Sequence, residues 1–206
     1  MPIHPFLTKL GVPIAVQDFF SESYSTDKIG NLIFNYGVDA FEHFGFAFHL
    51  VPKAKELWVC GNSNFSRQVF ICANAMEAIS YVTINHHKIT NLEKLTFIAI
   101  GTNVSMAEIN WIKPKFRNRD FGFIFSKDIL GQILDVKIAL ALYDLSVEIS
   151  IIDETVNVMF KDKVFSFSQA KFSYLAFCKA VGFRARIRTY KSKTHCCFLE
   201  QLISNV

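Results

Sequence analysis

The sequence predicts an α/β domain built on a parallel β-sheet flanked by helices, with a small α+β segment before it. From Gln68 onward, apolar runs of strand length alternate with stretches of helical periodicity, which is the pattern of a parallel sheet covered on both faces. The chain has 206 residues, of which 51% are hydrophobic and 19% charged, a composition that suits one compact core and excludes disorder. We place the N-terminal segment at residues 1–66 and the main domain at residues 67–206.

The N-terminal segment carries short and weak signals. Residues 4–20 indicate a short helix around residues 5–10, which the glycine and proline that follow would end. In an alternative interpretation residues 28–48 form one helix, although glycines interrupt it. Apolar runs next to glycines favour small antiparallel strands instead. These runs are residues 31–36, 44–50 and 57–60.

Four parallel strands and three connecting helices are expected in the main domain. Each strand is a continuous apolar run, as strands buried on both faces are. The second helix begins after Ser105, with Glu108 placed to complete a capping box. Right-handed crossovers would bring all of these strands into one sheet. The expected strands are residues 69–72, 95–100, 121–125 and 147–152, and the expected helices are residues 75–85, 105–116 and 129–145.

The C-terminal part of the chain is predicted from fewer signals. We expect a polar excursion over residues 156–164 and a helix over residues 168–181. A last strand follows at residues 183–190, and a terminal turn of helix at residues 197–203.

The sequence has no feature of a membrane or exported protein. No apolar run reaches the ~18 residues that a membrane-spanning helix needs. The N-terminus lacks the basic start and continuous apolar stretch of a signal peptide. The five cysteines form no Cys-x-x-Cys pair, which argues against structural zinc and a disulfide framework. Reduced thiols and a cytoplasmic location are therefore predicted, without membrane contact.

Three strand–turn–helix units share an apolar strand, a turn of small residues and the start of a helix. They read Val-Phe-Ile-Cys-Ala-Asn-Ala-Met-Glu-Ala-Ile-Ser-Tyr at residues 69–81, Phe-Ile-Ala-Ile-Gly-Thr-Asn-Val-Ser-Met-Ala-Glu-Ile at residues 97–109, and Phe-Ile-Phe-Ser-Lys-Asp-Ile-Leu-Gly at residues 123–131. A leader, His-Pro-Phe-Leu-Thr-Lys-Leu-Gly, lies at residues 4–11. In this order and spacing, the four stretches resemble the Toprim-like domains of primase-related proteins from plasmids and mobile elements. The resemblance covers most of the chain and implies a Toprim-like parallel sheet.

The resemblance also implies where a site would lie. A working Toprim site uses a glutamate after the first strand as general acid or base, and two aspartates after the third strand to hold Mg²⁺. At the corresponding positions this sequence has Ala73 and Ser126, so that Asp128 and, on the first helix, Glu77 are the carboxylates that remain. Lys127 adds a positive charge where a cation would sit. The resemblance therefore implies a degenerate site without metal, cofactor or catalysis.

Basic residues concentrate near the C-terminus, in the only strong charge run that we identify. The net charge of +4 permits an acidic partner, such as DNA or RNA. If residues 183–190 form a strand, alternate side chains on one face lie about 7 Å apart, close to the repeat of phosphates in nucleic acid. An equally weighted alternative is an edge strand that its charges protect from aggregation. The basic residues are Arg184, Arg186, Arg188, Lys191 and Lys193.

Other polar constellations are weaker. His86 and His87 are adjacent, so that their side chains diverge, and we interpret them as part of a solvated loop. His195 stands beside Cys196 and Cys197 but lacks a third orienting group, and core packing is the simpler interpretation.

Three functions remain open. The first is a catalytically inactive Toprim-like subunit of a plasmid, phage-related or mobile-element system, associated with nucleic acid or with a protein partner in a larger complex. The second is a protein-interaction scaffold without nucleic-acid binding. The third is a metal-dependent nuclease-like or primase-like enzyme with a relocated site, which would use Glu77, Asp128 and either Asp153 or Glu154 at strand ends.

Overall fold

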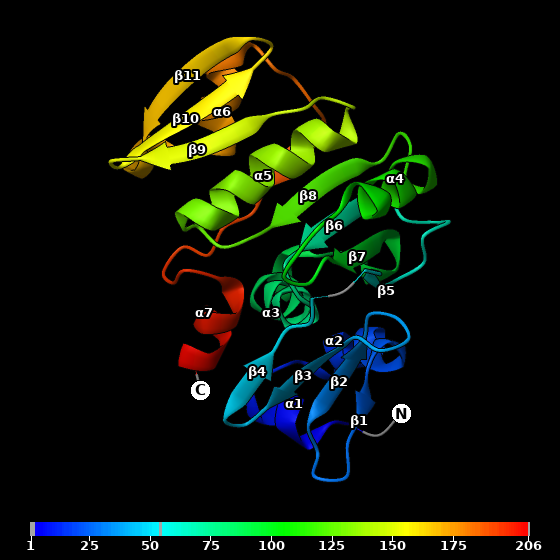
Figure 1. The fold of residues 1–206 in the computed structure, drawn as a ribbon. Coiled ribbons are helices and arrows are strands. Elements are labelled where there is room, and N and C mark those ends of the chain that lie inside the picture. The colour runs from blue at the N-terminus through cyan, green and yellow to red at the C-terminus, as the bar shows by residue number, and fades with distance from the viewer. Residues whose placement is uncertain (1–2, 54, 206) are drawn as a thin grey trace.

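The computed structural model describes residues 3–53 and 55–205. Within them the chain forms a central sheet of five strands, an N-terminal antiparallel sheet of four strands and a third, antiparallel sheet of three strands. Figure 1 shows the N-terminal sheet at the bottom, the central sheet in the middle and the third sheet at the top. The fold is therefore mixed α/β with a mostly parallel central sheet, as the sequence predicts.

Five strands form the central sheet: β5 (Trp58–Cys60), β6 (Gln68–Cys72), β7 (Leu95–Ala99), β8 (Asp120–Ile124) and β12 (Ile187–Thr189). Their order is β12-β8-β6-β7-β5. β5 lies antiparallel to β7 at one edge, and the other four strands run parallel. The strands predicted at residues 69–72, 95–100 and 121–125 are confirmed. The strand predicted at residues 57–60 is also present, and it belongs to this sheet.

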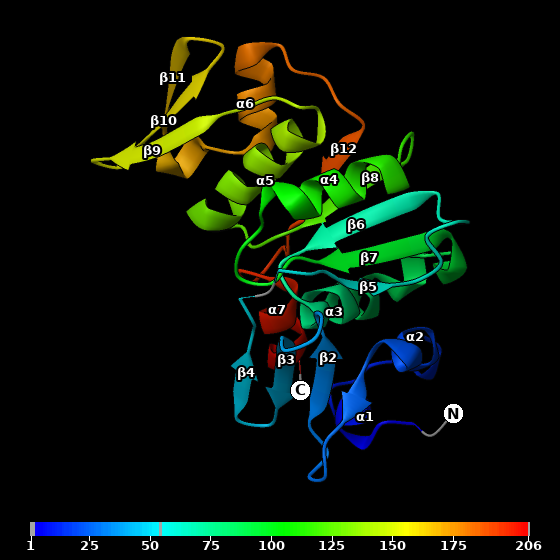
Figure 2. The same cartoon turned by 45° about the vertical axis from the view of Figure 1, so that its right-hand side comes forward.

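Helices cover both faces of the central sheet. They are α3 (Ala75–Asn85), α4 (Met106–Lys115) and α5 (Ile129–Leu142), and each matches a predicted helix. Buried residues of α3 share one hydrophobic cluster with Phe70 and Phe97, whereas those of α4 and α5 share another with Ile98. Figure 2 shows the helices on opposite sides of the sheet. Ser105 and Glu108 form the expected capping box at the start of α4.

The third sheet corrects two predictions. It consists of β9 (Glu148–Ile152), β10 (Thr155–Phe160) and β11 (Lys163–Ser168). The sequence predicts residues 147–152 as a fourth parallel strand and residues 156–164 as a polar excursion, and both predictions are wrong. Turns at residues 153–154 and 161–162 have positive φ at both positions, between 45° and 63°, which closes tight antiparallel hairpins. The fourth parallel strand of the central sheet is β12 instead.

The N-terminal segment consists of α1 (Pro5–Lys9), α2 (Ile14–Phe20), β1 (Ser25–Thr26), β2 (Leu32–Asn35), β3 (Phe41–Gly45) and β4 (Phe48–Leu50). Each strand pairs antiparallel with the next one along the chain. β2 confirms the strand predicted at residues 31–36. Residues 44–50, predicted as one strand, are divided between β3 and β4, because Gly45 pairs with Phe48 across a tight turn. The alternative helix over residues 28–48 is wrong.

The remaining helices are α6 (Tyr174–Val181), α7 (Phe198–Ser204) and the 3-10 helices η1 (Ser21–Ser23), η2 (His86–Lys88), η3 (Leu92–Lys94) and η4 (Gln169–Lys171). The helix predicted at residues 168–181 begins later, because the side chain of Ser173 caps α6 by accepting a hydrogen bond from the N–H of Ala176. The strand predicted at residues 183–190 is shortened to β12. None of the helices in the described part of the chain is long and apolar enough to cross a membrane.

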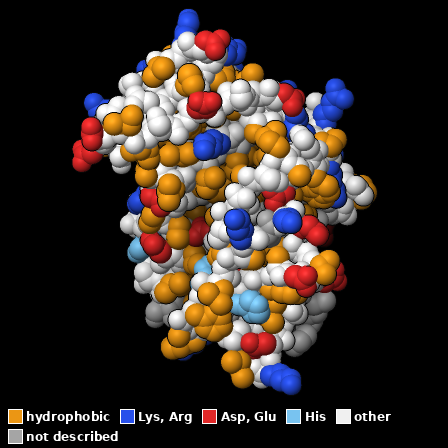
Figure 3. Space-filling view, in the orientation of Figure 1, with side chains coloured by type: hydrophobic (Ala, Val, Ile, Leu, Met, Phe, Trp, Pro, Cys, Tyr) orange, Lys and Arg blue, Asp and Glu red, His pale blue; other side chains and the backbone are white. Residues whose placement is uncertain are grey.

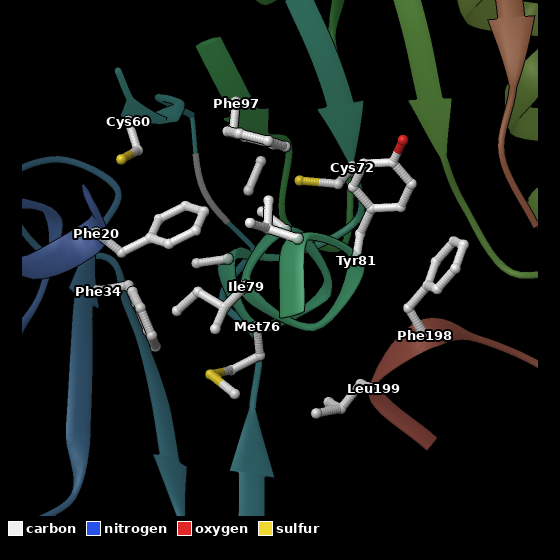
Figure 4. Packing of buried hydrophobic residues seen from close by; sticks show 14 of the residues in the cluster. Phe20, Phe34, Cys60, Cys72, Met76, Ile79, Tyr81, Phe97, Phe198 and Leu199 are labelled. Carbon is white, nitrogen blue, oxygen red and sulfur yellow. The ribbon is translucent and has the colours of Figure 1, made fainter. Parts of the chain in front are cut away.

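Helix α3 lies in the middle of one hydrophobic cluster. Figure 4 shows Ile79 of α3 with Phe34 of the N-terminal segment, Phe97 of β7 and Phe198 of α7 around the helix. The cluster therefore joins the N-terminal sheet, one face of the central sheet and the C-terminal helix in a single core.

Phe97 offers a test of this core. Its side chain is fully buried, and its ring stacks on Phe70 with the centroids 5.1 Å apart. Phe97→Ala should lower the free energy of unfolding by about 3–5 kcal/mol, because it removes apolar contacts and leaves a cavity. Phe65→Ala, at a side chain that is 74% exposed, is the matched control and should change it by less than about 0.5 kcal/mol. Urea denaturation measures both, and equal effects would contradict the described packing.

Candidate functional site

The carboxyl edge of the central sheet is the edge at which its parallel strands end. β6 lies between β7 and β8, so that the direction of chain progression reverses there. Open α/β sheets bind ligands in the crevice at such a switch point. Ala73 follows β6, while Ser126 and Asp128 follow the neighbouring β8. The structure thus places the three positions that the resemblance singles out after neighbouring strands of the carboxyl edge.

Asp128 caps the start of α5. Its Oδ1 atom accepts hydrogen bonds from the backbone N–H of Gly131 and from the hydroxyl of Ser126, both at 2.8 Å. The thiol of Cys196 donates to its Oδ2 atom at 3.6 Å. Burial acts to raise the pKa of Asp128, but these hydrogen bonds outweigh burial and hold the pKa below its ordinary value. The charge of Asp128 therefore stabilises a helix start.

Glu77 caps a helix other than its own. Its side chain is buried, and its two oxygens accept hydrogen bonds from the backbone N–H groups of Phe198 at 3.1 Å and Leu199 at 3.2 Å, at the start of α7. Burial raises the pKa of Glu77 above its ordinary value, although these hydrogen bonds act in the opposite direction. Both carboxylate oxygens are thus engaged within the fold.

Glu42 on β3 is a third carboxylate in this region, and the sequence analysis missed it. It is fully buried, and it accepts hydrogen bonds from the backbone N–H groups of Ala75 at 2.7 Å and Met76 at 3.2 Å, at the start of α3. The hydroxyl of Tyr36 donates to it at 2.7 Å, and Nε2 of His49 lies 2.9 Å away. The signal that could have found it is the alternation along β3, which puts Glu42 on the buried face.

A fourth carboxylate, Asp135 on α5, forms an ion pair with Lys191. Nζ of Lys191 lies 2.6 Å from Oδ2 of Asp135 and also donates to the carbonyl oxygens of Phe125 and Ser126. Asp135 is fully buried, and burial raises its pKa to about 7, with Lys191 acting in the opposite direction. The ammonium group of Lys191, a residue that the sequence assigns to nucleic-acid binding, is thus engaged within the fold.

Each of these carboxylates is bound to a helix start or to an ammonium group. Over residues 3–53 and 55–205, no three His, Cys, Asp or Glu side chains are grouped so that they could hold a metal ion. Asp153 and Glu154, which the relocated-site hypothesis combines with Glu77 and Asp128, lie in the turn between β9 and β10 of the third sheet. The carboxyl edge is therefore built to hold helices in place.

The cysteines beside this edge are protonated thiols. Burial raises the pKa of Cys197 to about 12, and the charge of Glu77 adds to the effect. Burial also raises the pKa of Cys196. His195 shares a hydrogen bond with the hydroxyl of its neighbour Thr194 through Nδ1, at 2.8 Å. Since the thiolate is the nucleophilic form of cysteine, neither thiol is activated for catalysis.

The C-terminal basic run is divided between the two ends of the sheet. Arg184, Arg186 and Arg188 are exposed and lie before or within β12, and exposure alternates along them as predicted. Arg184 and Arg186 precede the strand, so that the predicted stripe of three arginines on one strand is not formed. Lys191 and the exposed Lys193 follow β12 and lie toward the carboxyl edge. β12 is an edge strand, as the alternative of edge protection requires.

A basic cavity lies at the amino edge, where the parallel strands begin. The backbone N–H of Phe121 donates to the carbonyl of Arg186 at 3.0 Å, which holds the start of β12 beside the start of β8. In Figure 3, Lys and Arg side chains gather at the upper right, over α4 and the amino end of β8. The cavity has a volume of about 830 Å³, and its lining includes Lys113, Arg117, Arg119, Arg186, Phe121 and Tyr143.

Sequence analysis missed most of the basic cavity because it overlooked a second basic run. Four basic residues stand within seven positions, without an acidic residue between them, at the end of α4 and before β8. The C-terminal run is therefore not the only strong one. The residues of the second run are Lys113, Lys115, Arg117 and Arg119.

Among the described residues, no carboxylate forms an ion pair with the guanidinium groups of the basic cavity. Lys113 forms an ion pair with Asp144. Arg117, Arg119 and Arg186 have no ion-pair partner in the part of the chain that the structure describes. Such groups can bind the oxygens of a phosphate in pairs, because the planar fork of guanidinium N–H groups matches them.

No model of a protein family matches the chain, and no curated protein is significantly similar to it in sequence. The chemistry of the two edges is therefore what bears on function.

Asp135 implies a specific dependence of stability on pH. Because its pKa is raised to about 7, Asp135 of the folded state keeps its proton up to that pH and forms the ion pair with Lys191 above it, whereas the unfolded state releases the proton near pH 4. The unfolded state then binds fewer protons, so that the free energy of unfolding falls as the pH rises from about 4 to about 7, by at most about 1.4 kcal/mol per pH unit. Asp135→Asn should remove this decline, as measured by urea denaturation across that range.

The matched control for this measurement is Asp153→Asn in the turn between β9 and β10. It removes the same charge from an exposed position and should keep the pH dependence of the parent chain. A decline in Asp135→Asn as steep as that of the parent would contradict the raised pKa of Asp135.

Proposed function

We propose that this protein binds the phosphate backbone of nucleic acid without regard to base sequence, as a catalytically inactive Toprim-like subunit of a larger assembly. The observation that carries the proposal is the basic cavity. Three guanidinium groups without ion-pair partners among the described residues, together with Lys113, surround a hollow of about 830 Å³. The exposed Arg184 and Arg188 extend the positive charge on either side of Arg186.

Phosphate contacts of this kind account for affinity without sequence specificity. Each phosphate that an arginine neutralises releases a counterion, which favours binding at low salt. The contacts position the strand but do not reach the edges of the bases. The net charge of +4 acts in the same direction, because it attracts a polyanion at long range.

The carboxyl edge supports the absence of metal-dependent chemistry in this proposal. Ala73 and Ser126 stand where a Toprim site has carboxylates, and the oxygens of Asp128 and Glu77 accept hydrogen bonds from helix starts. A metal ion that recruited these oxygens would leave backbone N–H groups without acceptors. The link to a plasmid, phage-related or mobile-element system rests on the resemblance alone.

A protein-interaction scaffold is the second candidate, and exposed apolar side chains favour it. Phe46, Phe48 and Leu50, in and beside β4, are 80%, 42% and 61% exposed. β4 is an edge strand of the N-terminal sheet, and Figure 3 shows hydrophobic side chains gathered toward the lower left, over β3 and β4. Exposed apolar patches are typical of protein–protein contacts. Capture of a protein partner without any salt-dependent binding of nucleic acid would favour this candidate.

The first prediction from the proposal is that the purified protein neither nicks plasmid DNA nor synthesises primers with Mg²⁺ or Mn²⁺. The reason is that Ala73 and Ser126 supply no carboxylate and that Asp128 serves α5. Gel assays of nicking and of primer synthesis measure both activities. Metal-dependent activity that Asp128→Asn abolishes would contradict the prediction, since asparagine still caps a helix but is a poorer ligand for Mg²⁺.

The second prediction concerns the salt dependence of binding to unrelated oligonucleotides. Replacing Arg117, Arg119 and Arg186 together by Ala should weaken binding to all sequences alike. The plot of log affinity against log salt should flatten by up to about 2.7 if each arginine neutralises one phosphate. Fluorescence anisotropy at several salt concentrations measures the slope. Replacing Arg184, Arg186 and Arg188 tests the C-terminal run in the same way.

The control variant replaces Lys163, Lys171 and Lys179 by Ala. These lysines are exposed on β11, η4 and α6, none of them lines either cavity, and their loss changes the net charge by the same amount. Slopes that stay unchanged in both arginine variants would reject phosphate binding at the amino edge and assign Arg184, Arg186 and Arg188 to protection of the edge strand or to a protein contact.

A further inference from the structure

A second cavity opens at the amino edge, on the face of the central sheet that α3 covers. Its volume is about 620 Å³, within the range of sites for small molecules. It lies on the opposite face from the basic cavity, whose lining residues Phe116 and Phe121 pack with α4 and α5. We call it the tyrosine cavity, and its lining includes Tyr81, Tyr190, Gln68, Asn85, Arg67 and Lys94.

Gly122 of β8 makes room for the aromatic wall of this cavity. A Cβ atom at this position would lie 2.6 Å from ring atoms of Phe70 and 3.0 Å from the ring of Tyr190. Without it, the Tyr190 ring packs on Phe70 and Tyr81, with centroids 5.4 Å apart in both pairs. The Tyr190 hydroxyl accepts a hydrogen bond from Nε2 of Gln68 at 3.2 Å. The wall is therefore held in place before any ligand binds.

The polar groups on this wall keep hydrogen-bonding capacity. Nδ2 of Asn85 donates to the carbonyl of Tyr81 at 2.9 Å, and Oδ1 of Asn85 has no donor among the described residues. Oε1 of Gln68 likewise accepts no hydrogen bond from the described residues. Burial raises the pKa of Tyr81, and its hydroxyl therefore stays protonated. Donors and acceptors next to aromatic rings suit the edge and the face of a nucleobase.

Exposed cations border the tyrosine cavity and connect it with the basic cavity. The backbone N–H of Arg67 donates to the carbonyl of Lys94 at 2.8 Å, so that these two residues lie side by side at the amino edge. Gln68 pairs with Asp120 in register, so that Arg67 and Arg119 directly precede paired residues of β6 and β8. Arg119 lines the basic cavity. Arg67, Lys94 and Arg119 therefore place positive charge at this edge, on both sides of the exposed carboxylate of Asp120.

We infer that the tyrosine cavity binds one nucleotide, with the base at Tyr190, Gln68 and Asn85 and the phosphate at Arg67 and Lys94. A nucleotide combines a flat heterocycle, an edge of donors and acceptors, and an anion, and the lining has a counterpart for each. If the nucleotide belongs to a strand that the basic cavity holds, the inference rests on the proposed function. If the nucleotide is free, the inference stands without it. A base in a duplex is stacked and paired, so that the cavity selects unpaired nucleotides.

Titration with adenosine 5′-monophosphate, compared with inorganic phosphate, tests the cavity alone. Calorimetry should give tighter binding of the nucleotide than of phosphate, and the NMR signals of the Tyr190 ring and of the Gln68 and Asn85 amides should shift. Tyr190→Phe and Asn85→Ala should each weaken nucleotide binding about three- to tenfold, as the loss of one hydrogen bond does. Lys163→Ala, at an exposed position of β11 that lines neither cavity, is the matched control and should leave it unchanged.

Equal affinity for the nucleotide and for phosphate would overturn the inference. Nucleotide affinity that neither Tyr190→Phe nor Asn85→Ala changes would also overturn it. Urea denaturation shows whether each variant keeps its fold. If one of the two variants is unfolded, Gln68→Ala is tested in its place.

Oligonucleotides distinguish a free nucleotide from one within a strand. If the cavity takes a nucleotide of a strand, Tyr190→Phe weakens binding of single-stranded oligo(dA) and leaves binding of the oligo(dA)·oligo(dT) duplex unchanged. If it takes a free nucleotide, Tyr190→Phe affects the monophosphate alone. Absence of oligonucleotide binding together with retained binding of the monophosphate would refute the proposed function and support the tyrosine cavity as a site for free nucleotides.

Discussion

The buried carboxylate of Glu42 joins the N-terminal sheet to the start of α3, and the arrangement of the other layers depends on that contact. It accepts two backbone N–H groups that a helix start would otherwise leave unsatisfied in an apolar core. Tyr36 and His49 hold the carboxylate from its own sheet. Glu77 makes the same kind of contact between α3, on which it lies, and the start of α7, from whose backbone N–H groups it accepts hydrogen bonds. Two buried carboxylates thus connect three parts of the chain that hydrophobic packing alone would orient less specifically.

The two ends of the central sheet differ chemically. At the carboxyl edge, where α/β sheets usually hold ligands, the backbone N–H of Lys127 donates to the carbonyl of Cys196 at 2.9 Å, and Lys191 is paired with Asp135. The chain's own C-terminal residues occupy that edge. At the amino edge, residues of the two basic runs line the basic cavity on one face of the sheet, and Arg67 and Lys94 line the tyrosine cavity on the other. The guanidinium groups of Arg117 and Arg186 lack ion-pair partners among the described residues. The proposed phosphate contacts therefore lie at the end of the sheet opposite to the positions that resemble a Toprim site.

The positions that resemble a Toprim site illustrate how far sequence reasoning reaches. The absence of carboxylates at Ala73 and Ser126 is visible in the sequence. The role of the Ser126 hydroxyl is not visible in the sequence, because its hydrogen bond to Asp128 depends on the turn that precedes α5. The roles of Glu42 and Tyr190 were not predictable either, because their partners lie 33 and 122 residues away along the chain. The basic run before β8 was readable from the sequence and was overlooked.

The sequence by itself determined α3, α4 and the parallel strands β6, β7 and β8, because apolar periodicity and capping act between residues that are close along the chain. Only the tertiary structure decided that β12, and not β9, completes the parallel sheet. Both segments are apolar enough for a strand, and the choice depends on the hairpin turns after β9 and on the pairing of Ile187 with Phe121. The tertiary structure also decided which charges are engaged and which are available, since pairing depends on neighbours that folding brings together.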